Sequence, residues 1–333
     1  MKKLLYAIVV FQILSCSNTV KENESIIIFD DSVLNIINKT SKIEYIIDSI
    51  NLTEGPLWDK NSSSLLFTEI PKNTIHIWSE INGLNSYITP SGYTNYAPVI
   101  PNIGLMGANG LSFDKNGDLI IAQHGDRRLS RIKNIATYEP DFETIVDNYE
   151  GNRFNSPNDL TISSNGDIYF TDPTYGFMNL EDWSFDESVK ELSFSGIYKY
   201  SSESGIELLS TELNFPNGIA LSNNERYLYV NSSNTEENPV ILRYDLENNN
   251  EFEIFFDGSE LAKENDGNFD GLKVHSSGNI FSTGPGGILV ISEEGKLLAN
   301  IRFKDMLTNC AFDTDEKFLY VTAFSFVARI SLK

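Results

Sequence analysis

Residues 158–171 read Asn-Asp-Leu-Thr-Ile-Ser-Ser-Asn-Gly-Asp-Ile-Tyr-Phe-Thr. Two short apolar runs flank a polar turn in which Gly166 supplies the backbone freedom that a tight turn needs, so the stretch predicts a β-hairpin. The same pattern, a polar residue followed by an apolar run, a turn and a second apolar run, recurs along the chain. Its other copies start at Glu54, Asn109, Asn217 and Asp270, with a weaker sixth copy at Thr308.

The spacing of these copies predicts the architecture. They follow one another at intervals of about 40 to 60 residues, which is typical of propeller blades. Further strand-like runs follow several hairpins, as at residues 74–78, 196–200 and 252–256. Six repeats of about four strands each predict an all-β, six-bladed β-propeller. Residues 43–50 precede the first full copy, and we expect them to join the last blade beside residues 327–332 and close the ring.

The composition restricts the class of protein. The chain has 333 residues, a hydrophobic content of 41% and a charged content of 22%, as expected for a folded chain rather than a disordered one. Its formal net charge is −22. A polyanion repels phosphate groups, so nucleic acid and anionic lipid surfaces are excluded as partners.

The N-terminus predicts export and lipid attachment. Met1-Lys-Lys is followed by an apolar run over residues 4–14 and then by Ser15-Cys16. This run is too short to span a membrane and is typical of a signal peptide. Ile13-Leu-Ser-Cys16 resembles a bacterial lipobox, although an ordinary cleaved signal with an incidental cysteine is the alternative. We predict a signal at residues 1–15, lipidation of Cys16, a tether over 16–42 with one stray strand at 25–29, and the propeller over 43–333.

This interpretation places the protein in the cell envelope, in the bacterial periplasm or at the outer membrane, with the lipid as its sole membrane attachment. The other cysteine, Cys310, lies in an apolar run. An acylated Cys16 leaves it without a disulfide partner. Cys310 is therefore expected to be a buried, unreactive thiol.

The leading position of the repeat carries the candidate site. Equivalent positions at the start of the inner strands of a propeller face the central channel, so Glu54, Asn158, Asn217 and Asp270 are expected to converge. Two carboxylates and two amide oxygens are the ligands that a hard cation such as Ca²⁺ prefers. Each residue alone also fits an ordinary turn, because Asn-Gly and Asp-Gly are common turn dipeptides. Their common phase in the repeat favours a shared site.

Several motifs together resemble one protein family. They are Glu54-Gly-Pro-Leu-Trp, Gln123-His-Gly-Asp-Arg-Arg, Ser156-Pro-Asn-Asp-Leu, Tyr169-Phe-Thr-Asp-Pro-Thr-Tyr-Gly and Phe215-Pro-Asn-Gly-Ile. The chain resembles the gluconolactonase/regucalcin-like (senescence marker protein) six-bladed propellers over residues 50–325, and the bacterial gluconolactonase branch in particular.

The resemblance implies a divalent metal, Ca²⁺ or alternatively Zn²⁺, held by Glu54, Asn158, Asn217 and Asp270. The implied reaction is hydrolysis of a sugar lactone, in which the metal polarises the carbonyl and activates water. Asp270 is the candidate catalytic residue, as a base, a nucleophile or a ligand alone.

Four other residues are candidate substrate contacts. Asn109 holds the repeated position in the second copy, and His124 follows an inner strand. Asp172 and Tyr175 belong to a loop that the family resemblance places near the mouth of the channel. Residues 177–194 form a long insertion that could cover the site or remain a passive loop.

Two alternative functions remain open at this stage. A phosphotriesterase- or arylesterase-like hydrolase uses similar oxygen ligands on the same fold, because a fold does not determine a substrate. A lipoprotein that binds a ligand without catalysis belongs to a different class, and metal content together with lactone assays separates it from an enzyme.

Overall fold

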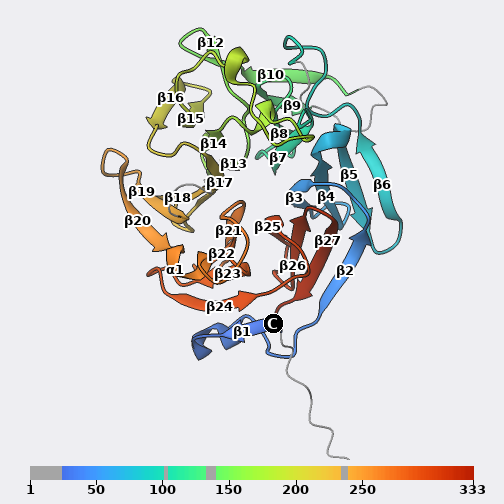
Figure 1. Ribbon diagram of the computed structural model, residues 1–333, viewed down its shortest axis with the longest axis vertical. Coiled ribbons are helices and arrows are strands. Elements are labelled where there is room, and N and C mark those ends of the chain that lie inside the picture. Colours follow the sequence, from blue (N-terminus) through green and yellow to red (C-terminus); the bar gives the residue numbers. More distant parts are fainter. Residues whose placement is uncertain (1–24, 101–103, 133–139, 234–238) are drawn as a thin grey trace, which may run out of the picture.

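The computed structural model describes residues 25–100, 104–132, 140–233 and 239–333. In this part of the chain, six antiparallel sheets follow one another around a ring (Figure 1). The predicted all-β, six-bladed propeller is confirmed. Cys16 and the predicted signal peptide lie outside the described residues. Among the residues that are described, no helix combines the length and apolar character needed to cross a membrane.

The first three blades take their strands in chain order. Blade one consists of β3 (Thr53–Asp59), β4 (Ser64–Glu69), β5 (Thr74–Ser79) and β6 (Gly83–Ile88). Blade two consists of β7 (Ala108–Phe113), β8 (Leu119–Gln123), β9 (Arg128–Ile132) and β10 (Phe142–Val146). Blade three consists of β13 (Leu160–Ile162), β14 (Ile168–Asp172), β15 (Gly196–Ser201) and β16 (Gly205–Ser210).

The last three blades include both ends of the described chain. Blade four consists of β17 (Pro216–Leu221), β18 (Tyr227–Ser232), β19 (Val240–Asp245) and β20 (Glu251–Asp257). Blade five consists of β21 (Leu272–Val274), β22 (Ile280–Gly284), β23 (Gly287–Ile291) and β24 (Leu297–Ile301), with β1 (Ile26–Ile28) at its edge. Blade six consists of β25 (Leu307–Phe312), β26 (Phe318–Ala323), β27 (Phe326–Ser331) and β2 (Ile43–Asp48).

The remaining elements lie in the connections. They are the hairpin of β11 (Asn148–Tyr149) and β12 (Asn152–Arg153), the 3₁₀ turns η1 (Asp31–Asn35), η2 (Ile70–Lys72), η3 (Tyr175–Phe177) and η4 (Glu187–Val189), and the short helix α1 (Ser259–Ala262).

The ring closes where the sequence predicts. Strand β2 pairs antiparallel with β27, with Ile43 opposite Ile330 and Asp48 opposite Phe326. In Figure 1 the blue β2 lies beside the red β27. This pairing covers the edge of the last blade, which would otherwise expose unpaired backbone groups.

Hydrophobic clusters fill the spaces between neighbouring blades. Because side chains alternate along a strand, adjacent residues of one strand enter different clusters. Ile121 of β8 belongs to the cluster that contains Leu66 of blade one, whereas its neighbour Ile120 belongs to the cluster that contains Phe170 of blade three. Each blade is therefore held from both sides, and the alternation found in the sequence is the cause.

The segment before residue 43 corrects one prediction. The strand expected at residues 25–29 is present as β1, but it pairs with β24 and extends blade five, so the described part of the expected tether over 16–42 belongs to the propeller. Val33 and Ile37 are fully buried against this blade. The segment is mostly polar, but its few apolar side chains pack on the outer strand of blade five. The propeller therefore includes residues 26–37 as well as the predicted range from 43.

Candidate active site

The leading residues of the repeat lie at irregular points of the inner strands. The pairing register shifts after Glu54 in β3, after Ala108 in β7 and after Pro216 in β17. In blades three and five, the inner strands β13 and β21 begin at Leu160 and Leu272, just beyond Asn158 and Asp270. Bulges turn a side chain out of the regular pleat and are frequent beside active sites. Here they occur at the positions whose side chains line the channel.

The glycine that follows a leading residue has a packing role. Gly218 N donates to Asp270 O at 2.8 Å, which joins blade four to blade five. A Cβ atom at Gly218 would lie 2.3 Å from the same carbonyl oxygen. Gly55 would clash in the same way with Asn109 O. The Asn-Gly and Asp-Gly pairs thus mark close contacts between blades around the channel, rather than the turns that they resemble in the sequence.

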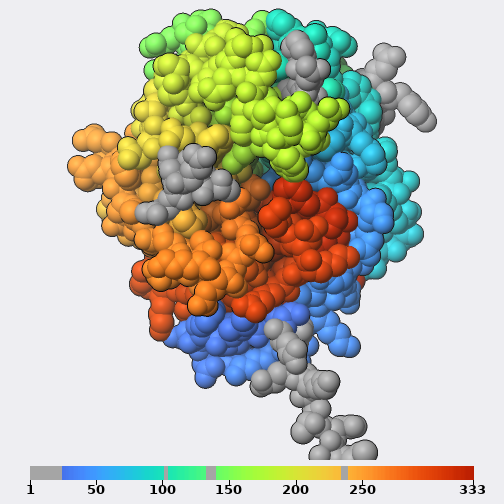
Figure 2. All heavy atoms as spheres, in the orientation of Figure 1, coloured from blue at the N-terminus to red at the C-terminus, as the bar shows by residue number. Residues whose placement is uncertain are grey.

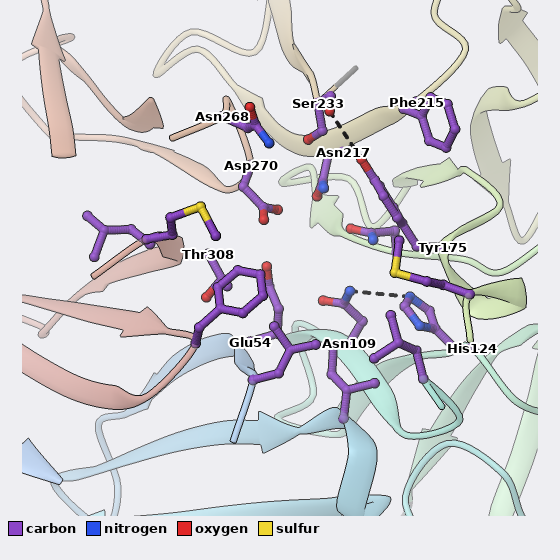
Figure 3. Close-up of a pocket in the computed structure, with 18 of the residues that line it drawn as sticks. Glu54, Asn109, His124, Tyr175, Phe215, Asn217, Ser233, Asn268, Asp270 and Thr308 are labelled. Atoms are coloured by element: carbon purple, nitrogen blue, oxygen red, sulfur yellow. Dashed lines mark hydrogen bonds between the residues drawn. The ribbon is translucent and has the colours of Figure 1, made fainter. Parts of the chain in front are cut away.

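All four predicted metal ligands line one cavity of about 430 Å³ on the channel axis, in the size range of small-molecule sites. Asn109, His124 and Tyr175 line it as well. In Figure 3, Glu54, Asn109, Asn217 and Asp270 approach its centre from different blades. The described residues thus bring together seven of the eight candidate site residues outside the N-terminus.

The eighth, Asp172, does not line the cavity. It is fully buried, and its carboxylate accepts hydrogen bonds from Asn155 N and Ser156 N, both at 2.8 Å. Burial raises the pKa of Asp172 to about 7, against the lowering effect of these two N–H groups. The expected substrate contact is therefore replaced by a structural one, because the carboxylate fixes the loop that leads to Asn158.

Four oxygen atoms in the cavity are buried without a hydrogen-bond partner in the described part of the chain. They are the side-chain Oδ1 atoms of Asn109, Asn158, Asn217 and Asp270. A buried polar atom without a partner costs about 1–3 kcal/mol. Such atoms are rare in native proteins, and four of them around one cavity indicate a ligand that would supply the missing contacts.

The pKa values of the two carboxylates at the cavity are raised. Burial, and then the charge of Asp159, raise the pKa of Glu54 to about 7. Burial, and then the charge of Glu54, raise the pKa of Asp270 well above its usual range. A cation between them would relieve both effects.

Three residues that the sequence did not single out form a layer below Glu54. Asn309 Nδ2 donates to Glu54 Oε2 at 3.0 Å and to Asp159 Oδ2 at 3.2 Å. Lys273 Nζ lies 3.3 Å from Asn309 Oδ1 and 3.7 Å from Asp159 Oδ2. Asp159 and Asn309 occupy the position that is glycine in the other four repeats. The absence of glycine at these two positions is the sequence feature from which Asp159 and Asn309 could have been identified.

His124 and Asn109 form a neutral pair. Asn109 Nδ2 lies 3.2 Å from His124 Nε2. Burial lowers the pKa of His124 to about 4, so the ring is uncharged near pH 7 and its Nε2 accepts from the amide. The contact leaves Asn109 Oδ1 as the atom without a partner. Tyr175 donates its hydroxyl to Ser233 O at 3.3 Å, and burial raises its pKa.

The donor set fits a hard cation. No group of three or more His, Cys, Asp or Glu side chains in the described ranges is placed to hold a metal ion. A metal here therefore needs the amide oxygens of Asn158 and Asn217 beside the two carboxylates. Oxygen ligands of these two kinds are those that Ca²⁺ takes in proteins.

Comparison with known proteins identifies the family. Residues 52–325 match the family described as SMP-30/Gluconolactonase/LRE-like region. The chain belongs to this family. It is 33% identical to the gluconolactonase of Zymomonas mobilis over 310 residues. The aligned region covers 90% of this chain and 83% of that protein.

Two solved structures of the same fold are similar to this member of the family. A gluconolactonase from Xanthomonas campestris has 22% identity and a TM-score of 0.77, covering 92% of this chain and 94% of its own. A calcium-binding regucalcin from Agrobacterium tumefaciens has 16% identity and a TM-score of 0.61, covering 86% of this chain and 95% of its own.

Proposed function

We propose that the protein is a gluconolactonase-like lactone hydrolase that uses a divalent cation. The observation that carries this proposal is the convergence of two carboxylates and three unpartnered amide oxygens on one channel cavity. The similarity to the gluconolactonase of Zymomonas mobilis over 90% of the chain supports the reaction class. A sugar lactone is the substrate that this similarity favours.

Glu54, Asn158, Asn217 and Asp270 are the residues that would hold the cation. When bound, a divalent cation polarises a carbonyl oxygen and lowers the pKa of water. Ca²⁺ suits the all-oxygen donor set, and Zn²⁺ is the alternative. The calcium-binding relative from Agrobacterium tumefaciens supports the first choice.

Asp270 is the proposed general base. Its carboxylate has one oxygen without a partner, and it lies across the cavity from Asn109 (Figure 3). A general base must lie within hydrogen-bond reach of the water that it deprotonates, and Asp270 lines the cavity in which that water would stand. In the reaction the carboxylate takes a proton from water while the water oxygen bonds to the carbonyl carbon. The ring C–O bond then breaks, and the carboxyl group returns its proton to the leaving oxygen, which gives the open-chain hydroxy acid.

Asn109 is the proposed binding group for the substrate. The amide is fixed by His124 Nε2 at 3.2 Å and leaves its own oxygen free towards the cavity. An amide oxygen held in this way accepts from a substrate hydroxyl without first losing a contact to the protein. Orientation of this kind lowers the cost of reaching the reactive geometry.

The test is an assay of the full-length protein with δ-gluconolactone after treatment with a chelator. We expect hydrolysis, its loss without metal, and its return with Ca²⁺. Hydrolysis that persists with no metal bound would remove the cation from the proposal. A protein that cleaves a phosphotriester or an aryl ester but no lactone would support the other hydrolase class. Binding without turnover of any of these compounds would support the non-catalytic alternative.

We also propose that Cys16 is lipidated and that the lipid anchors the protein in the cell envelope. The motif at residues 13–16 supports it.

A further inference from the structure

The cavity wall above the carboxylates is apolar. Four of the residues that line the cavity stand two positions before a leading residue, and we call them the upper layer of the cavity. Three of the residues in this layer that line the cavity are apolar, namely Leu52, Phe215 and Met306, and the fourth is Asn268. Ile70, Leu105, Leu307 and Phe324 extend the same wall.

The insertion at residues 177–194 adds three more apolar side chains to this wall, Met178, Trp183 and Phe185. The ring of Phe185 lies 5.6 Å from that of Phe215, and the ring of Trp183 lies 6.4 Å from that of Phe324. The insertion therefore reaches across to the C-terminal blade. In Figure 2 the yellow-green segment meets the red segment near the middle of this face.

Trp183 is held at the mouth in an unusual conformation. Its φ angle is +61°, a left-handed value that is uncommon for a bulky residue. The side chain is 55% exposed although it lines the cavity. A large apolar group that stays in water at a pocket rim is a feature of binding sites. Backbone strain of this kind also concentrates at functional positions.

Two polar groups at this level, those of Ser233 and Tyr175, are engaged with the protein itself, and the third polar residue, Asn268, is exposed. Ser233 Oγ donates to Phe269 O, and Tyr175 OH donates to Ser233 O at 3.3 Å. Deeper in the cavity, at the leading position of the sixth copy, Thr308 Oγ1 donates to Thr53 O at 2.6 Å. Among the described residues that line the cavity, the buried amide and carboxylate oxygens without a partner all belong to leading residues. Among the described residues, the cavity thus has a polar floor and an apolar upper part.

We propose that the substrate is a lactone with an apolar substituent on its ring. The lactone group meets the floor formed by Glu54, Asn109 and Asp270. The substituent, an alkyl chain or an aryl group, packs in the upper part between Phe215 and Trp183. This proposal rests on the proposed lactone hydrolysis. It departs from the sugar lactone that the similarity favours, because the upper part of the cavity is apolar.

The apolar wall predicts a preference for lactones that carry an apolar substituent over lactones that carry none. Burial of one methylene group is worth about 0.8 kcal/mol, which is about a fourfold gain in kcat/KM. δ-Valerolactone has no substituent, and δ-nonalactone has a butyl substituent on the same ring. We expect kcat/KM for δ-nonalactone to exceed that for δ-valerolactone by about 10²-fold when the whole chain is buried.

The substitution Trp183→Ala tests the place of the substituent. We expect the ratio of the two kcat/KM values to fall by about fivefold or more, because the side chain that covers the substituent is lost. A folding defect lowers both values and leaves their ratio unchanged. Phe29→Ala is the matched control, since Phe29 is an aromatic residue with 53% exposure that lies outside the cavity lining.

The outcomes separate the two proposals. Hydrolysis of δ-gluconolactone with equal kcat/KM for the other two lactones would overturn the apolar substituent and leave the lactone hydrolase standing. If Trp183→Ala leaves the ratio of the two kcat/KM values unchanged, the assignment of the substituent to the space beside Trp183 is likewise overturned. No hydrolysis of any of the three lactones would overturn the hydrolase and this inference with it.

Discussion

At the scale of single residues, Asn309 joins the two buried carboxylates below the cavity. One amide nitrogen serves both Glu54 and Asp159. The pKa of Glu54 is lowered by this contact, although burial dominates and raises it to about 7. Asn309 therefore holds Glu54 in place, and we regard it as a positioning residue rather than a catalytic one.

We expect Asn309→Ala to lower the free energy of unfolding by about 1–3 kcal/mol, because a buried acceptor loses its donor. The loss should be greater at pH 8 than at pH 5. Glu54 has a folded pKa of about 7, so it is ionised at pH 8 and needs the N–H group most there. Urea denaturation at both pH values measures the difference. Asn85→Ala, at an exposed position, is the control, and an equal loss at both pH values would argue against the role.

His124 predicts a pH dependence of stability. Burial lowers the pKa of His124 in the folded protein from 6.5 to about 4. Between these pH values the unfolded chain therefore binds a proton on His124 that the folded protein does not bind. The contribution of the neutral histidine to the free energy of unfolding is present above pH 6.5 and is lost as the pH falls towards 4. The shift corresponds to about 3 kcal/mol. Comparison of wild type with His124→Gln over this range should show a shallower decline in the variant. Parallel curves would contradict the buried, neutral histidine.

For some single residues, the role predicted from local sequence rules differs from the role in the structure. Asn-Gly and Asp-Gly pairs indicate turns by local rules, but Gly218 is needed because Asp270 O passes close to it. Asp172 has the residue type of a site carboxylate, yet it binds two backbone N–H groups in the interior. Both distinctions depend on which backbone lies nearby, and the sequence of one repeat does not contain this information.

At the scale of elements, alternation and turns predict most strands. The turn glycine Gly166 has a positive φ angle as expected, and Gly117 and Gly278 have positive φ angles in the corresponding turns of blades two and five. Glu225 has a φ of +58° without being glycine, in the turn between β17 and β18. The closing pair of β2 and β27 also agrees with the prediction. The segment before β2 was misjudged because its few apolar residues pack on a distant blade.

Ile37→Ala tests whether this N-terminal segment belongs to the fold. Ile37 is fully buried in the cluster that joins the segment to blades five and six. We expect a loss of about 2–4 kcal/mol in the free energy of unfolding, as for other buried Ile→Ala changes. Chemical denaturation with Phe29→Ala as the exposed control gives the value. A loss near zero would restore the tether interpretation for this stretch.

At the scale of the whole molecule, the ring explains why the site could be predicted. Propeller symmetry brings one position of each repeat to the axis, so residues more than 200 positions apart meet around one cavity. The ring position of Glu54 and Asp270 follows from the period alone. The layer above them does not follow, because Trp183 and Phe185 belong to an insertion that has no counterpart in the repeat.

The attachment of the molecule to a membrane is a separate prediction. Cys16→Ser should move the protein from the membrane fraction to the soluble fraction of the cell envelope, because the predicted acyl attachment is lost. Fractionation with an antibody against the propeller measures this. Equal membrane association of wild type and variant would contradict the lipid anchor and leave the fold unaffected.

The most direct test of the central claim is the rate of δ-gluconolactone hydrolysis by Asp270→Asn, followed by titration of the acid released. The change keeps the shape of the side chain and removes its ability to take a proton. Asp266→Asn, an exposed neighbour outside the cavity lining, is the control. We predict a fall in kcat/KM of about 10²–10⁴-fold for Asp270→Asn with its unfolding temperature retained, and wild-type activity for the control. Wild-type activity in Asp270→Asn would contradict the assignment of this cavity as the active site.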